Sequence, residues 1–236
     1  MVESMYQKWL KKEEEWIGGY CAQTRKSSLL KVVPLTLIVT ALLFGGITFL
    51  GSGDVEDLLM GGVGGLFLGL VIGIFYLCIL FVSLRPSRYV QEIVRSVAEL
   101  SMNEAEKEVL GAEMLEALTH EDQVLSYQME GPKSKGTPAR LVRTLHYFFQ
   151  VGSTPYSVLI RMSDIAEVKA SSEKKVATTR SGNMKTHHYF TLYTIGFYRK
   201  DRFEHGLADS ELPDSAMGFF QESLRDRALE MVQREM

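Results

Sequence analysis

The sequence has 236 residues, 46% of them hydrophobic, and its 26 basic and 29 acidic residues leave a formal net charge of −3. This near-neutral balance gives no global signal for nucleic acid, so we expect no nucleic-acid partner and only local basic surfaces. Two cysteines, Cys21 and Cys78, are too few for a disulfide framework.

Residues 1–28 place apolar side chains at helical spacing, with lysines and glutamates between them. They predict an amphipathic cytoplasmic helix. Tryptophan favours the membrane interface, so Trp9 and Trp16 are expected to be interfacial anchors. The alternative is that this stripe docks on the soluble domain or on another subunit, since the run Glu13-Glu14-Glu15 weakens attraction to anionic lipid.

Residues 29–84 predict a transmembrane hairpin. As helices, the apolar runs 29–50 and 58–84 would rise roughly 33 and 40 Å, and the hydrocarbon core needs about 30 Å. The polar segment 51–57 separates them, and no Lys or Arg occurs from Val32 to Leu84. Two core helices of this length with no charge other than Lys31 would be rare in a soluble protein.

The flanking charges predict the orientation of the hairpin. Basic residues precede the first run and follow the second, whereas the segment between them carries only acidic charges. The positive-inside rule therefore predicts a multi-pass protein of the cell membrane, with both termini in the cytoplasm and residues 51–57 outside.

Glycines recur every four residues along the second run and form one flat strip, which allows another helix to approach closely. The partner we expect is the first run of the same chain, and the same strip of another subunit is the competitor. The predicted packing residues are Ala41, Gly45, Gly61, Gly65, Gly69 and Gly73.

Residues 85–121 predict a helical connector. The apolar pattern that begins at Tyr89 indicates one helix, and Ser101 with Glu104 resembles a capping box that opens a second. The glutamates of the second helix are expected to form a solvated face, because no histidine is interleaved at ligand spacing.

From Gln123 the periodicity becomes that of strands, and Pro213 is expected to open a final amphipathic helix. The chain as a whole is therefore predicted to be an α+β membrane protein with about seven antiparallel strands. The predicted strands cover residues 123–130, 140–151, 156–162, 165–171, 187–194, 196–200 and 202–206.

The order of these elements, the segment from Ile160 to Val168, the late hairpin 197–207 and the closing helix resemble the bacterial pleckstrin-homology-like domains, including GRAM-related ones tethered to membrane hairpins. The resemblance covers residues 122–236. It implies a strongly bent antiparallel sheet plugged at one end by the helix. It also implies that the loop after the first strand grips phosphoinositide headgroups, with Lys133, Lys135 and Arg140 at matching places.

Two predicted loops are locally basic, and cations near an anionic leaflet attract it. The first, 131–140, is followed closely by Arg143, and the second covers 172–186. The alternative is that both are solvated loops without a ligand. The candidate lipid-binding residues are Lys133, Lys135, Arg140, Arg143, Lys174, Lys175, Arg180 and Lys185.

Nothing in the sequence indicates catalysis. His187 and His188 are adjacent on a predicted strand and point to opposite faces, and the other histidines are scattered. Nucleophile-elbow, zinc-protease, Walker and dinucleotide motifs are absent. We therefore expect no enzyme activity, catalytic residue, metal site or cofactor.

The function we expect is that of a membrane-anchored binding or scaffold protein, whose partners are anionic lipid headgroups, an unidentified protein, or both. The alternative is a small oligomeric channel or transporter assembled through the glycine strip. No ionisable residue of either apolar run marks a transport path, which favours the first interpretation.

Overall fold

A computed structural model describes residues 3–131, 136–152, 156–182, 184–204 and 212–234. The chain forms two compact units, one of residues 15–86 and the other of residues 1–14 with 87–236. The boundary falls within the first helix, α1 (Met5–Ser27). The predicted connector and β-domain therefore belong to one unit, together with the start of the N-terminal helix.

The unit of residues 15–86 is a helical hairpin. The end of α1 continues through a π-helical turn, η1 (Ser28–Val32), into α2 (Val33–Ser52), and α3 (Val55–Ser83) follows. The turn between α2 and α3 needs only Gly53 and Asp54 rather than the predicted 51–57. Gly53 ends α2 in the left-handed conformation, with a φ of 73°. Asp54 opens α3 by accepting a hydrogen bond from the amide of Glu56.

In the other unit, the part of the chain after the hairpin starts with two helices, α4 (Pro86–Glu99) and α5 (Glu104–Ala117). The capping box of α5 is formed by Asn103 and Glu106, not by Ser101 and Glu104 as the sequence suggested. Ser101 instead adopts a φ of 50° in the turn between the helices. The cap lies two residues later than predicted because the turn uses Ser101 to reverse the chain.

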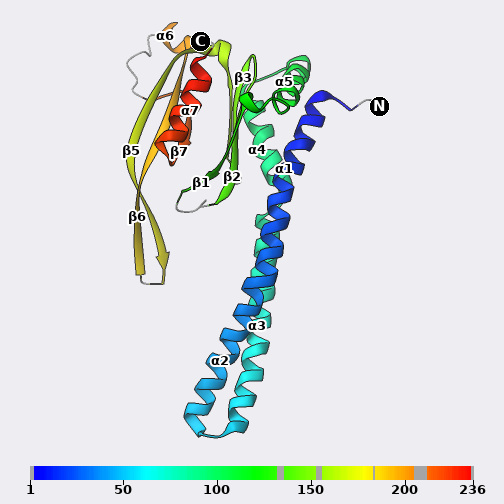
Figure 1. The fold of residues 1–236 in the computed structure, drawn as a ribbon, viewed down its shortest axis with the longest axis vertical. Coiled ribbons are helices and arrows are strands. Elements are labelled where there is room, and N and C mark those ends of the chain that lie inside the picture. The colour runs from blue at the N-terminus through cyan, green and yellow to red at the C-terminus, as the bar shows by residue number, and fades with distance from the viewer. Residues whose placement is uncertain (1–2, 132–135, 153–155, 183, 205–211, 235–236) are drawn as a thin grey trace. The chain divides into compact units, whose positions relative to one another are not determined.

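Two antiparallel sheets follow (Figure 1). The first contains β1 (Val124–Met129), β2 (Thr137–Arg143), β3 (Tyr147–Gly152) and β4 (Tyr156–Arg161) in sequence order. The second contains β5 (Ile165–Ser181), β6 (Met184–Arg199) and β7 (Ser215–Phe219), also in sequence order. Short helical elements are η2 (Glu121–Gln123), η3 (Met162–Asp164) and α6 (Lys200–Glu204), and α7 (Glu222–Gln233) closes the chain.

Several predicted strand boundaries were wrong. The predicted strand 140–151 is divided between β2 and β3 by a turn in which the amide of Thr144 donates to the carbonyl of Tyr147. The segment 172–186 is no loop, because β5 and β6 pair through it as one long hairpin. In place of a strand at 202–206, the described residues form α6, and residues 205 and 206 lie outside the described ranges. The final helix begins at Glu222, since β7 precedes it.

The core of this unit lies between the two sheets and α7. Phe148 of the first sheet contacts Phe197 of the second, with ring centroids 6.1 Å apart. Ala228 and Val232 of α7 belong to the same buried cluster. The amphipathic helix predicted at the C-terminus therefore covers the apolar side of the sheets, and the fold is α+β.

Candidate functional site

The glycine strip of α3 lies against α2 of the same chain. A Cβ atom added to Gly65 would meet the carbonyl oxygen of Thr40 and lie 2.8 Å from Cα of Ala41. On the opposing helix, a Cβ on Gly45 would lie 3.0 Å from the carbonyl oxygen of Leu58. Real Cβ atoms essentially never lie within 3.0 Å of backbone atoms, so glycine is required at position 65, and a Cβ at position 45 would be tighter than most real contacts.

All six of the predicted packing residues lie along this contact. The remaining glycines of the strip meet α2 at Thr48 and Phe44 for Gly61, at Thr40 and Leu37 for Gly69, and at Val33 for Gly73. Gly64, which precedes Gly65 by one residue, has open space where its Cβ would be. The close contact is therefore confined to one face of α3.

The outward faces of the same two helices are apolar and exposed. Leu42 is 71% exposed, Leu50 86%, Phe67 70% and Phe75 68%. The helical stretches Met5–Ser52 and Val55–Glu99 are long and apolar enough to cross a membrane, and only 6% and 17% of their most apolar windows are buried. A monomeric soluble protein rarely exposes apolar surface on this scale.

In the other unit, the start of α1 docks on the first sheet. Trp9 is completely buried, and its ring meets that of Phe149 edge-on at 5.4 Å. The indole nitrogen donates a 2.8 Å hydrogen bond to Glu13, and the carboxylate of Glu13 forms an ion pair with Arg140 on β2. The part of the stripe up to Glu13 therefore docks within the unit that contains the sheets, which is one of the alternatives that the sequence left open.

This docking corrects two predicted sites. Trp9 is no interfacial anchor, because its side chain has no surface left for lipid. Arg140 is 7% exposed and held by Glu13, so it does not belong to a headgroup-binding loop. Trp16 is partly buried. No sequence pattern indicates this pairing, because Glu13 and Arg140 lie more than a hundred residues apart in the chain.

The first turn of α1 also packs closely on α5. A Cβ on Gly111 would lie 2.5 Å from Cα of Tyr6, and the amide of Met5 donates a 2.8 Å hydrogen bond to Glu108. Burial raises the pKa of the Tyr6 phenol above its usual value, and the charge of Glu104 raises it further. The neutral phenol is thus the form that fits this contact.

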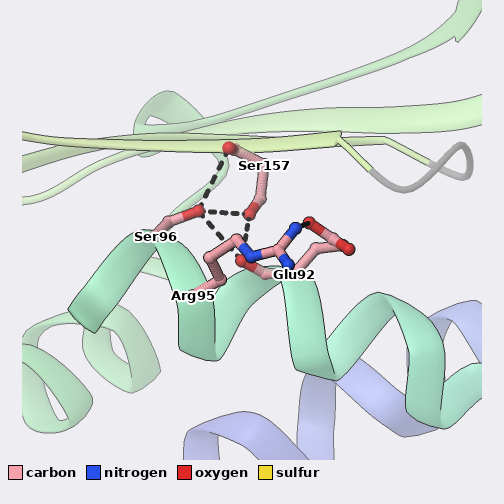
Figure 2. Close-up of polar contacts among 4 residues, drawn as sticks. All are labelled: Glu92, Arg95, Ser96 and Ser157. Carbon is pink, nitrogen blue, oxygen red and sulfur yellow. Dashed lines mark hydrogen bonds and ion pairs between the residues drawn. The ribbon is translucent and has the colours of Figure 1, made fainter. Parts of the chain in front are cut away.

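A second polar contact joins α4 to β4, the edge strand of the first sheet (Figure 2). Ser157 donates its hydroxyl to the carbonyl of Glu92 at 2.8 Å, and the hydroxyl of Ser96 lies 2.5 Å from that of Ser157. Arg95 pairs with Glu92 at 3.3 Å on the surface beside it. Edge strands carry unpaired backbone groups, and this helix covers part of that edge.

Of the remaining candidate lipid-binding residues, Arg143 lies beside a hollow in the structure, and four others lie on the β5–β6 hairpin. Lys133 and Lys135 lie outside the described residues. Arg143 is partly buried at the rim of a hollow of about 490 Å³, which Lys200 and His146 also line. Here the imidazole of His146 lies 2.5 Å from Glu113.

The same hollow provides no catalytic arrangement within the described ranges. Its serine, Ser163, donates its hydroxyl to Asp164 at 3.1 Å, while His146 is engaged by Glu113. The hydroxyl of Ser163 and the imidazole of His146 are therefore bound to different carboxylates and not to each other. No group of three or more His, Cys, Asp or Glu residues that could hold a metal is found in the part of the chain that was described.

The other four basic candidates lie on the β5–β6 hairpin, which extends beyond the rest of its sheet (Figure 1). Strand β7 pairs with β6 only from Tyr193 to Phe197. From there to the hairpin turn, β5 and β6 pair only with each other and form a two-stranded ribbon. Most of the described side chains of this ribbon are exposed. A two-stranded ribbon has no core of its own, so both of its faces are available for contacts.

The register of this hairpin assigns each basic side chain to a face. Lys174 pairs with Thr191, Val176 with Tyr189, Thr178 with His187 and Arg180 with Lys185, and paired residues point to the same side. Lys175 lies on the other side, where it forms a 3.0 Å ion pair with Glu173. As predicted, the adjacent His187 and His188 occupy opposite faces.

Comparisons with known proteins add no relative: no family model, no curated protein and no solved structure matches the chain.

Proposed function

We propose that the chain is a membrane-anchored, non-enzymatic binding or scaffold protein, held in the bilayer by α2 and α3 and presenting its β-domain on the cytoplasmic side. The observation that carries this proposal is the contrast between the two sides of the helical hairpin. The glycines of its strip, Gly61, Gly65, Gly69 and Gly73, face the contact between the helices, whereas its large apolar side chains point outward. Lipid is the environment in which such a surface is stable.

The architecture of the β-domain supports the resemblance to pleckstrin-homology-like domains. Four antiparallel strands form one sheet, three form another, and α7 covers the core between them. Two packed sheets replace the single bent sheet that the resemblance implied, and the order of strands followed by a closing helix is the same.

The position of the glycines argues against an oligomeric channel assembled through them. Gly65 and Gly69 already face Thr40 of the same chain, so the strip has no room for a second subunit. A channel of that kind requires that replacing Gly65 and Gly69 with Leu abolish oligomers and ion flux. We expect no flux from the unaltered protein in planar bilayers.

Alkaline carbonate extraction of membranes from cells that express the full chain tests the anchoring. The protein is expected to stay in the membrane pellet and to be released by mild detergent. Leu42→Lys with Phe75→Lys should lower the integrated fraction, because each charge at membrane depth costs about 2.5 to 3.5 kcal/mol. Val55→Lys, beside the hairpin turn, is the control. Release of the unaltered protein by carbonate would overturn the proposal.

A further inference from the structure

The β5–β6 ribbon carries one face with a distinct chemistry, here called the basic face and defined by Lys174, Val176, Arg180, Lys185, His187 and Tyr189. It continues the side of β6 whose inner residues, Ile195 and Phe197, are buried in the core. Beyond Tyr193, which is covered by Arg225 of α7 at 5.4 Å, this side becomes exposed. The face is therefore an outward extension of the core side of the sheet.

The basic face carries no opposing charge. The sequence from Lys174 to Thr191 contains no acidic residue, and the nearest one, Glu173, lies on the other face and pairs with Lys175. The strand rise of about 3.3 Å per residue places Lys174 about 20 Å from Arg180 along the ribbon. Arg180 and Lys185 are a cross-strand pair near the tip, so two like charges lie side by side there. Like charges directly opposite destabilise an isolated ribbon, and an anionic ligand would relieve this repulsion.

An exposed apolar pair separates these cations. Val176 and Tyr189 lie directly opposite each other and are 51% and 79% exposed. Tyrosine with an aliphatic partner suits the boundary between headgroups and acyl chains, where the ring is buried and the hydroxyl stays wet. A single-stranded nucleic acid would instead require several aromatic rings spaced for stacking, and the exposed residues of this face offer Tyr189 with only the smaller imidazole ring of His187 beside it.

We propose that the basic face of the β5–β6 ribbon binds the surface of an anionic lipid bilayer, with Lys174, Arg180 and Lys185 at the phosphates and Val176 and Tyr189 in the interface. This inference rests on the proposed function, because it takes a membrane-anchored protein as its premise. Each cation contributes about fivefold to partitioning, so the three together contribute about 100-fold.

The test uses the full chain with Cys21→Ser and Cys78→Ser, and one new cysteine labelled with an environment-sensitive fluorophore. Thr178→Cys reports from the basic face, and Ala177→Cys reports from the opposite face of the same strand. The protein is reconstituted in bilayers of neutral lipid or of neutral lipid mixed with phosphatidylglycerol. A lipid-borne quencher is placed in the protein's own bilayer or in separately added vesicles.

We expect the fluorophore at Thr178→Cys to be quenched only when phosphatidylglycerol is present, whether the quencher is in the protein's own bilayer or in added vesicles. The fluorophore at Ala177→Cys should be quenched less. Lys174→Glu should reduce the affinity at least fivefold, whereas its neighbour Lys175→Glu, on the other face, should have little effect. Absence of quenching, equal quenching in neutral lipid, or equal effects of the two substitutions would overturn the inference. A fluorophore response to single-stranded RNA without one to lipid would also overturn it.

The same samples separate this inference from its premise. Flotation of the reconstituted protein with neutral vesicles reports insertion of α2 and α3 and does not depend on the ribbon. If the protein floats but the ribbon gives no quenching, the inference alone fails. If the protein does not float, the proposed function fails.

Discussion

Glu13 and Arg140 form an ion pair in which neither side chain is more than 9% exposed, although one lies on α1 and the other on β2. The carboxylate of Glu13 also accepts the hydrogen bond of the Trp9 indole. The pair thus fixes the start of α1 on the sheet together with Trp9, and it makes the N-terminal segment part of the folded β-domain.

Breaking this ion pair from one side should destabilise the protein. Glu13→Gln keeps an oxygen for Trp9 but removes the carboxylate charge that pairs with the buried guanidinium of Arg140, at an expected cost of about 3 to 5 kcal/mol. Glu14→Gln, at the exposed neighbouring position, should change stability by less than about 0.5 kcal/mol. Thermal unfolding of the full chain in detergent measures both. Equal melting temperatures for the two variants would contradict the account.

The neighbouring glycines Gly64 and Gly65 should respond oppositely to alanine. Gly65→Ala pushes a methyl group into the backbone of α2 and should cost about 1 to 3 kcal/mol by overpacking. Gly64→Ala meets open space and should be neutral or slightly stabilising. Disulfide formation between cysteines at Val33 and Gly73, which face each other, measures the helix contact in the membrane. The prediction fails if Gly64→Ala weakens that contact as much as Gly65→Ala does.

Stability should fall at alkaline pH partly through Tyr6. Its folded-state pKa is raised by burial and by Glu104, so the folded state retains the proton longer than the unfolded state. The stabilisation is complete below the ordinary pKa of about 10 and is lost as the pH rises above it. In the Tyr6→Phe variant, the melting temperature should decline less steeply as the pH rises from about 9 to about 11. Some decline should persist, because burial also raises the pKa of Tyr147. An unchanged slope would refute a role for Tyr6.

Ser96 and Ser157 should act as a unit in holding α4 to β4. Each alanine variant is expected to cost about 1 kcal/mol, and the double variant less than the sum, because the hydroxyls share their partners. Arg95→Ala is the control, since its side chain is 71% exposed and its ion pair with Glu92 should contribute little. A double-mutant cycle from thermal unfolding provides the test, and strict additivity would count against the coupling.

The continuous apolar runs were sufficient to predict two helices of spanning length. Apolar residues at helical spacing were sufficient to predict the amphipathic C-terminal helix, because a helix with one buried side leaves this pattern in the sequence. The division between β2 and β3 was missed because its turn at Thr144 contains neither Gly nor Pro. The β5–β6 ribbon was missed for a related reason. Its lysines and arginines resemble a solvated loop, and its alternation becomes visible only once the strands are paired.

The basic site could be predicted only as a set of residues. Composition marks Lys174 and Lys175 as equivalent, whereas the cross-strand register places them on opposite faces. Arg140 shows the same limit, since its counterion on α1 is brought to it by tertiary packing alone. Val176 and Tyr189, which also lie on the basic face, were not among the predicted lipid-binding residues. Both residue types favour strands, and their presence in a charged segment was a signal that this segment forms strands rather than a loop.

In the proposed function, lipid surrounds α2 and α3 and the β-domain lies on the cytoplasmic side. Labelling of single cysteines in whole cells by a membrane-impermeant thiol reagent tests both points, in a background with Cys21→Ser and Cys78→Ser. Ser52→Cys, at the hairpin turn, should be labelled in intact cells, and Gly182→Cys, at the tip of the ribbon, only after permeabilisation. Labelling of Gly182→Cys in intact cells, or protection of Ser52→Cys there, would contradict the account.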